Sequence, residues 1–160
     1  MQIQAKIAEI QEKKLVGKRL MMSFSNNRTV ELWKSFMPLL KEIANNISTD
    51  LISLQIYPTD YFSDLNPNLE FEKWALTEVS NFDQIPENME SFVLQGGLYA
   101  VFGYKGSSAD KRIFQTIFTS WLPNSEYKLD TRPHFEVLGE KYKNNDPESE
   151  EEIWIPVKKK

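Results

Sequence analysis

Apolar and polar side chains alternate from Leu51 to Tyr57, and Phe71 to Val79 is a further predicted strand. A period of two is the pattern of a strand, because successive side chains point to opposite faces of the sheet. The sequence predicts further extended segments at residues 7–10, 15–24, 92–104, 134–138 and 151–157. The first dozen residues also fit a helix, since three isoleucines there have helical spacing. Gly17 and the pair Gly96-Gly97 interrupt their strands and predict a bulge or bend.

Two segments have the three-and-four spacing of an amphipathic helix. The first runs from about Thr29 to Asn45, and Pro38 inside it predicts a kink because proline removes a backbone hydrogen bond. The second follows the capping cluster Ser107–Asp110 and runs to about Trp121. Tyr61 and Phe62 lie in the turn-rich loop after the strand 51–57, where we expect them to cover the site as a lid.

Both halves of the chain therefore follow the order strand, helix, strand, strand. The segment Glu72–Leu76 corresponds to Glu152–Pro156, with a tryptophan at the centre of each. We infer a duplication, with half-repeats at about 1–80 and 90–160 in a single domain of residues 1–160. The predicted fold is α+β: an antiparallel sheet with pseudo-two-fold symmetry, two helices on one face and a cleft on the other.

Alternation also assigns side chains to the two faces of this sheet. We expect the helices to cover the face formed by Ile52, Leu54, Ile56, Phe135, Val137, Ile153 and Ile155. The opposite face would then carry Gln55, Tyr57, Trp74, Glu136 and Trp154. Contiguous aromatic side chains on an exposed face usually mark a binding site, so we place the cleft there.

Composition narrows the possible functions. With no cysteine and one histidine, disulfides, thiolate metal sites and multi-histidine metal sites are excluded, and we expect neither a metal nor a cofactor. The net charge of −4 argues against direct binding of nucleic acid, which needs a basic surface. No apolar run is long enough to cross a membrane, and the N-terminus lacks the apolar core of a signal peptide. We therefore expect a cytoplasmic protein.

Glu136 is the residue that stands out, because it is a charge inside an apolar strand. Three interpretations are open: it opposes the charge of a cationic ligand, it acts as a general base with a raised pKa, or it is a structural carboxylate bonded to a tyrosine or an amide. Four rings, Trp154, Trp74, Tyr57 and Tyr99, are candidates for an aromatic box around a ligand, and each is also compatible with an ordinary core position.

The second half of the chain resembles the GyrI-like family, the effector-binding domains attached to AraC-class and MerR-class transcription regulators. The resemblance rests on the order of several short segments: Gly96–Gly106, Phe114-Gln115, Trp121–Pro123, Pro133–Glu136 and Glu151–Val157. It implies the duplicated fold and a cleft lined by aromatic residues. In multidrug-sensing members a glutamate in the cleft faces lipophilic cations, and Glu136 matches its position, with Trp154 and Tyr99 as ring partners.

Family regulators also carry a helix-turn-helix domain, for which this chain has no room, so the resemblance implies a stand-alone effector-binding protein. The first expectation for its function is binding of a lipophilic, cationic or aromatic small molecule, with Glu136, Trp154, Tyr99, Tyr57, Trp74 and Gln55 as ligand contacts. A hydrolytic branch of the family acts on cyclopropane-containing compounds, and in that alternative Glu136 is the general base. A third alternative is a protein-interaction module acting on a regulator or a topoisomerase through the acidic region 142–152. The sequence leaves open whether the protein is a monomer or a dimer.

Overall fold

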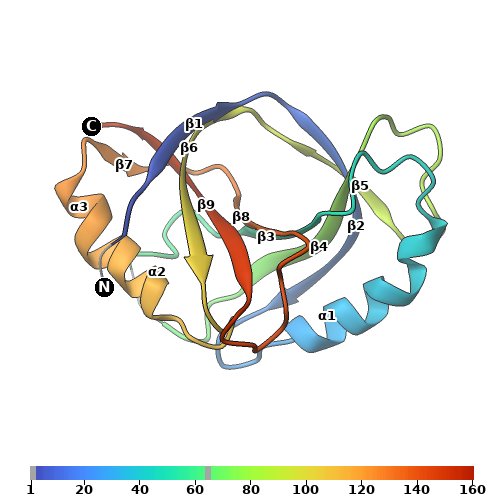
Figure 1. Cartoon of the computed structure of the whole chain (residues 1–160), viewed down its shortest axis with the longest axis horizontal. Coiled ribbons are helices and arrows are strands. Elements are labelled where there is room, and N and C mark those ends of the chain that lie inside the picture. The colour runs from blue at the N-terminus through green and yellow to red at the C-terminus, as the bar shows by residue number, and fades with distance from the viewer. Residues whose placement is uncertain (1–2, 64–65) are drawn as a thin grey trace.

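The computed structural model describes residues 3–63 and 66–160, which form an antiparallel sheet with helical segments at its two ends (Figure 1). In chain order the elements are β1 (Lys6–Ile10), β2 (Lys13–Met22), α1 (Thr29–Phe36), the 3₁₀ segment η1 (Met37–Glu42), β3 (Leu51–Ile56), β4 (Phe71–Val79), β5 (Glu90–Leu94), β6 (Gly97–Lys105), α2 (Arg112–Thr116), the π-helical segment η2 (Ile117–Trp121), α3 (Leu122–Asn124), β7 (Tyr127–Leu129), β8 (His134–Leu138) and β9 (Glu150–Lys159).

The strand order shows the duplication. The sheet runs β1-β6-β9-β8-β3-β4-β2-β5, with β7 paired to β9, so that β6, β9 and β8 mirror β2, β4 and β3 about the central pair. In that pair Leu54 lies opposite Phe135, and the next strand on each side places Trp74 beside Leu54 and Trp154 beside Phe135. The predicted α+β fold with pseudo-two-fold symmetry is confirmed.

Both helical segments cover the same face. One row of directly opposed residues crosses this face from β4 to β6, in the order Ala75, Ser53, Glu136, Ile153 and Phe102. At the β4 end, α1 packs Leu32 and Phe36 into the cluster that contains Ala75, and at the β6 end α2 and η2 pack Ile113 and Ile117 into the cluster that contains Ile153 and Phe102. Glu136 therefore lies near the middle of the helix-bearing face.

The helices follow their sequence signals closely. Helix α1 gives way to the 3₁₀ segment η1 one residue before Pro38, as the proline predicts. The second helical stretch starts at Arg112, whose amide is capped by Asp110 Oδ1 at 3.0 Å, and continues through a π-helical segment to Asn124, three residues beyond the predicted end. Residues 6–10 form β1, so the helical alternative is wrong for this stretch.

The face without helices is filled at its centre by core residues. Strand β1 leads into β2, and β5 into β6, after only two residues each, and these long segments arch over the sheet (Figure 1). They bring Ile10, Leu15 and Leu94 into one buried cluster with Leu54 and Phe135. The sheet is thus buried on both faces, by helices on one and by its own outer strands on the other.

This double burial overturns the predicted assignment of faces. Ile52, Leu54 and Phe135, expected under the helices, pack on the face without them, together with Ile56 and Val137. Glu136 and Gln55, expected on the other face, share the helix-bearing face with Ile153 and Ile155, as does Tyr57, which packs against the α1 cluster. Alternation shows which side chains of one strand share a face, but it cannot say which face the helices cover when both faces are apolar.

The predicted bulge at Gly17 is absent, because β2 pairs with β4 in an unbroken register from Lys14 to Met22. Gly17 and Gly97 nevertheless each have a steric reason to be glycine. A Cβ atom on Gly17 would overlap the carbonyl oxygen of Ala75 in the neighbouring strand. Gly97 has a φ of 149°, and a Cβ there would lie 2.6 Å from Cζ of Arg132. Gln95 and Gly96 separate β5 from β6, which begins at Gly97, where the sequence predicted one strand with a bulge.

Candidate functional site

Glu136 is a partly buried carboxylate between the two halves of the sheet. It lies opposite Ser53 of β3 and Ile153 of β9. Gln55 Nε2 donates a long hydrogen bond of 3.4 Å to its Oε1, and within the described residues the carboxylate has no ion pair. Burial raises its pKa to about 7, against the opposing attraction of Lys73. Near neutral pH the protein therefore holds an acid that is poised between its two charge states.

A group of aromatic rings lies beside this acid on the helix-bearing face. The Tyr57 ring meets His134 edge-on, with centroids 4.9 Å apart, and packs against Tyr61 at 4.6 Å. Phe62 stacks on His134 at 5.4 Å and on Phe118 at 5.3 Å. Phe62 belongs to the first half of the chain and Phe118 to the second, so this contact spans the centre of the face. Tyr61 and Phe62 thus contact Tyr57 and His134 on the helix-bearing face. Their role as a lid over a bound ligand stays a prediction.

The ionisable rings of this group are neutral near pH 7. His134 is buried, and burial lowers its pKa to about 3. The pKa of Tyr57 is raised well above its usual value, first by burial and then by the charge of Glu136. Glu136 therefore faces uncharged aromatic surfaces on this side.

Three further charged residues act on Glu136. Lys73 lies opposite Gln55 in the β3–β4 pair, and Glu151 lies two residues before Ile153, on the same face of β9. Lys111 precedes α2 and lies over the Phe114 ring at 5.5 Å. All three change the pKa of Glu136 through their charges. No local sequence signal marks these three residues as part of the site, although alternation in β4 places Lys73 on the face opposite to Trp74.

The other predicted ring partners lie elsewhere. Tyr99 is fully buried and donates a hydrogen bond of 2.8 Å to the carbonyl of Pro133. Trp74 is buried in the same cluster, and Trp154 stacks on Phe135 with centroids 5.2 Å apart. These three rings are on the face without helices, so the expected aromatic box that combines them with Glu136 is wrong. Of the six predicted contacts, the structure brings together Glu136, Gln55 and Tyr57.

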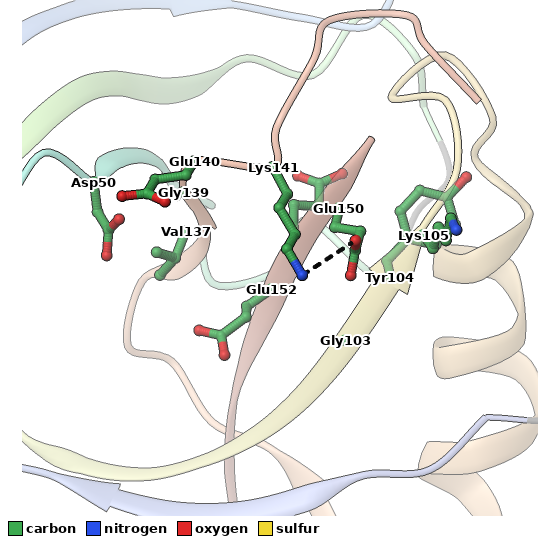
Figure 2. A pocket seen from close by; sticks show the side chains of 11 residues that line it. Asp50, Gly103, Tyr104, Lys105, Val137, Gly139, Glu140, Lys141, Glu150 and Glu152 are labelled. Atoms are coloured by element: carbon green, nitrogen blue, oxygen red, sulfur yellow. Dashed lines mark ion pairs between the residues drawn. The ribbon is translucent and has the colours of Figure 1, made fainter. Parts of the chain in front are cut away.

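An open hollow of about 670 Å³ lies at one end of the sheet (Figure 2). Its lining comprises Asp50, Gly103, Tyr104, Lys105, Val137, Gly139, Glu140, Lys141, Glu150, Glu151 and Glu152. Lys141 Nζ lies 3.8 Å from Glu150 Oε2, and most of the remaining charges are acidic. Glu151 belongs both to this lining and to the charges around Glu136. Gly103, Val137 and Glu152 of the lining, however, lie opposite one another on the face of the sheet away from Glu136.

In the described part of the chain, no group of three or more histidine, cysteine, aspartate or glutamate side chains is arranged to hold a metal ion. None of the described helices has the length and apolar character needed to cross a membrane.

The profile of a protein family matches residues 6–157, nearly the whole chain; the family is Cass2, the integron-associated effector binding proteins. The chain belongs to this family. The Cass2 assignment agrees with the predicted likeness to effector-binding domains of the GyrI-like type. Fold and family together make the chain an effector-binding domain.

One curated relative of this Cass2-family domain is a transcription regulator. The chain is 28% identical over 155 residues to the transcriptional regulator BrlR of Pseudomonas aeruginosa, covering 96% of this chain and 55% of BrlR. It thus spans about half the length of that relative. Among solved structures, the C-terminal domain of EcmrR matches with a TM-score of 0.71 and 22% identity over all of both chains. SAV2435 bound to tetraphenylphosphonium matches with a TM-score of 0.68 and 16% identity, over 97% of this chain and 94% of that one. At these identities the two structures establish a shared fold.

Proposed function

We propose that this domain binds a lipophilic small molecule with a positive charge on the helix-bearing face, with Glu136 as the opposing charge. Gln55, Tyr57 and Phe62 are the further contacts. The main support for this proposal is the state of the Glu136 carboxylate, which is partly buried at the centre of the fold. Among the described residues it has one long hydrogen bond and no ion pair.

Such a carboxylate is costly to keep ionised. Removing a charge from water destabilises the folded state unless a partner compensates it, and here the cost is visible as a pKa near 7. A cationic ligand would supply the missing partner, so that ligand binding and ionisation of Glu136 favour each other. The faces of Tyr57 and Phe62 would add about 0.5–2 kcal/mol each to a desolvated cation.

The comparisons support a ligand of this class. SAV2435 shares the fold over nearly all of its length, and its bound ligand, tetraphenylphosphonium, is both lipophilic and cationic. The relationship to BrlR and EcmrR supports a role in which the bound molecule is a signal for a transcription regulator.

The test compares a cation with a neutral aryl compound. Affinities for tetraphenylphosphonium and for uncharged triphenylphosphine oxide are measured by calorimetry in the wild type and in Glu136→Gln. We expect the variant to lose roughly tenfold in affinity for the cation and little for the oxide, as for a charge-assisted contact. Glu9→Gln, which changes an exposed glutamate of β1, is the matched control. An equal loss for both compounds would refute charge selection by Glu136.

The alternative of a hydrolase has one observation in its favour. A general base works best with a pKa near the operating pH, and burial gives Glu136 such a pKa. Tyr99 cannot assist it from the opposite face, which leaves Tyr57 as the nearby acid. Turnover of a cyclopropane-containing compound that disappears in Glu136→Gln would support this alternative. Binding of such a compound without turnover would oppose it. The third alternative, a protein-interaction module acting through residues 142–152, stays a prediction.

A further inference from the structure

Lys73 is the positively charged residue of β4 on the helix-bearing face. It lies directly opposite Gln55, whose amide reaches Glu136. The side chain is partly buried, and burial lowers the pKa of its ammonium group while the charge of Glu136 raises it. In the described residues the ammonium takes part in no hydrogen bond or ion pair.

The charges on this face are therefore present but not paired with each other. Glu136 and Glu151 are partly buried acids, and Lys73 is a partly buried base. In the described part of the chain none of the three forms an ion pair. They interact through their electric fields only. Elsewhere the protein does pair partly buried charges: Lys13 Nζ lies 3.4 Å from Glu78 Oε1.

A site with unpaired groups of both signs fits a ligand with both kinds of group. We propose that Lys73 is a specificity-determining residue, and that the ligands of this domain are aromatic cations that also carry an anionic or strongly hydrogen-bond-accepting group. The cation lies against Glu136 and the acceptor against Lys73. This inference rests on the function proposed above. It narrows the ligand class from simple lipophilic cations to cations that also carry an acceptor group, with an anionic acceptor bound best.

The competing possibility makes the opposite prediction. If Lys73 instead acts as an internal cation that partly neutralises Glu136, it weakens every cationic ligand, and removing it strengthens all of them. The two possibilities are separated by ligands that differ only in the acceptor group.

Rhodamine B and its ethyl ester are such a pair, because they share one cationic ring system and differ in a free or an esterified carboxylate. Affinities are measured by fluorescence anisotropy in the wild type, Lys73→Met and the control Lys14→Met, which changes an exposed lysine of β2. We expect the wild type and the control to prefer rhodamine B roughly fivefold to tenfold, and Lys73→Met to lose that preference. A preference that is absent, or that survives in Lys73→Met, overturns the inference.

Glu136→Gln, measured with the same two dyes, tests the proposed function separately. We expect it to weaken both dyes, because both carry the cation. If it weakens both while Lys73→Met leaves their ratio unchanged, the proposed function stands and the role of Lys73 is refuted. If Glu136→Gln leaves both affinities unchanged, the charge partner is not Glu136 and the proposed function fails, whatever the ratio shows.

Discussion

Gln55 of β3 donates a hydrogen bond to Glu136 of β8 across the boundary between the two half-repeats, with 3.4 Å between Nε2 and Oε1. It is the one hydrogen bond to this carboxylate in the described part of the chain, and it favours the ionised form. The same amide nitrogen lies 3.2 Å from Ser53 Oγ, which orients it. The acid between the halves is thus tuned by a residue from the opposite half.

Replacing Gln55 by leucine removes this donor. We expect the pKa of Glu136 to rise further above 7, so that the pH at which half of the cation affinity develops moves upward by a few tenths of a unit to about one unit. The measurement is the affinity for tetraphenylphosphonium as a function of pH. In Ser53→Ala the donor remains, and the midpoint should move less; an unchanged midpoint in Gln55→Leu would contradict the assigned contact.

Glu136 should make the protein less stable as the pH rises. The pKa of the folded state is raised from 4.5 to about 7, so between these values the folded chain binds more protons than the unfolded chain, and stability falls with increasing pH. We expect Glu136→Gln to be more stable than the wild type by about 1–3 kcal/mol at pH 8 and similar to it below pH 4.5. Urea unfolding at a series of pH values measures this difference. A constant difference across the range would show that Glu136 does not titrate as described.

His134 should make the protein less stable as the pH falls, which is opposite to the effect of Glu136. Its folded-state pKa is lowered from 6.5 to about 3, so the unfolded chain binds more protons between these values, and stability falls as the pH decreases. His134→Phe keeps an aromatic ring against Tyr57 and Phe62 and removes the titration. We compare the free energies of unfolding of the variant and the wild type at two pH values. The difference in favour of the variant should be about 2–3 kcal/mol larger at pH 4 than at pH 8. An equal difference at both pH values would mean that His134 is protonated in the folded state.

Phe62 connects the halves by stacking on His134 and Phe118. Phe62→Ala should lose aromatic contact area over the site, and we expect a severalfold loss of affinity for tetraphenylphosphonium, measured by calorimetry. Phe24 is a second exposed phenylalanine, which touches Phe71 at a centroid distance of 6.3 Å. Phe24→Ala is therefore the matched control. If both variants lose the same affinity for tetraphenylphosphonium, Phe62 has no specific role over the site.

Much of this fold can be predicted from the sequence, because its signals are local. Pro38 predicts a kink in the first helix, and the structure has a change from α1 to a 3₁₀ segment there. The two tryptophans at 74 and 154 identify the repeat. β7 was missed because three residues are too few for a pattern. The residues of the candidate site can be predicted from the sequence only in part. Glu136 is visible as a charge in an apolar strand, but its neighbours come from pairing between strands.

The main wrong prediction concerns which face of the sheet the helices cover, and the reason is physical. Leu54 and Gln55 are both buried, on opposite faces of β3. Apolar residues at alternate positions usually indicate the covered face, but here the outer strands cover one face and the helices the other. Only the register, which sets Glu136 beside Ile153 and Ser53, shows that the acid lies on the helix-bearing face.

The most direct test of the account is the affinity for tetraphenylphosphonium between pH 6 and pH 8, in the wild type and in Glu136→Gln. With a pKa of about 7, the ionised fraction of Glu136 rises about tenfold over this range. Because the neutral acid still binds about tenfold more weakly, we expect the affinity of the wild type to rise roughly fivefold and that of the variant to stay nearly constant and weaker. A wild-type affinity that stays constant with pH, or a rise that persists without the carboxylate, would contradict it.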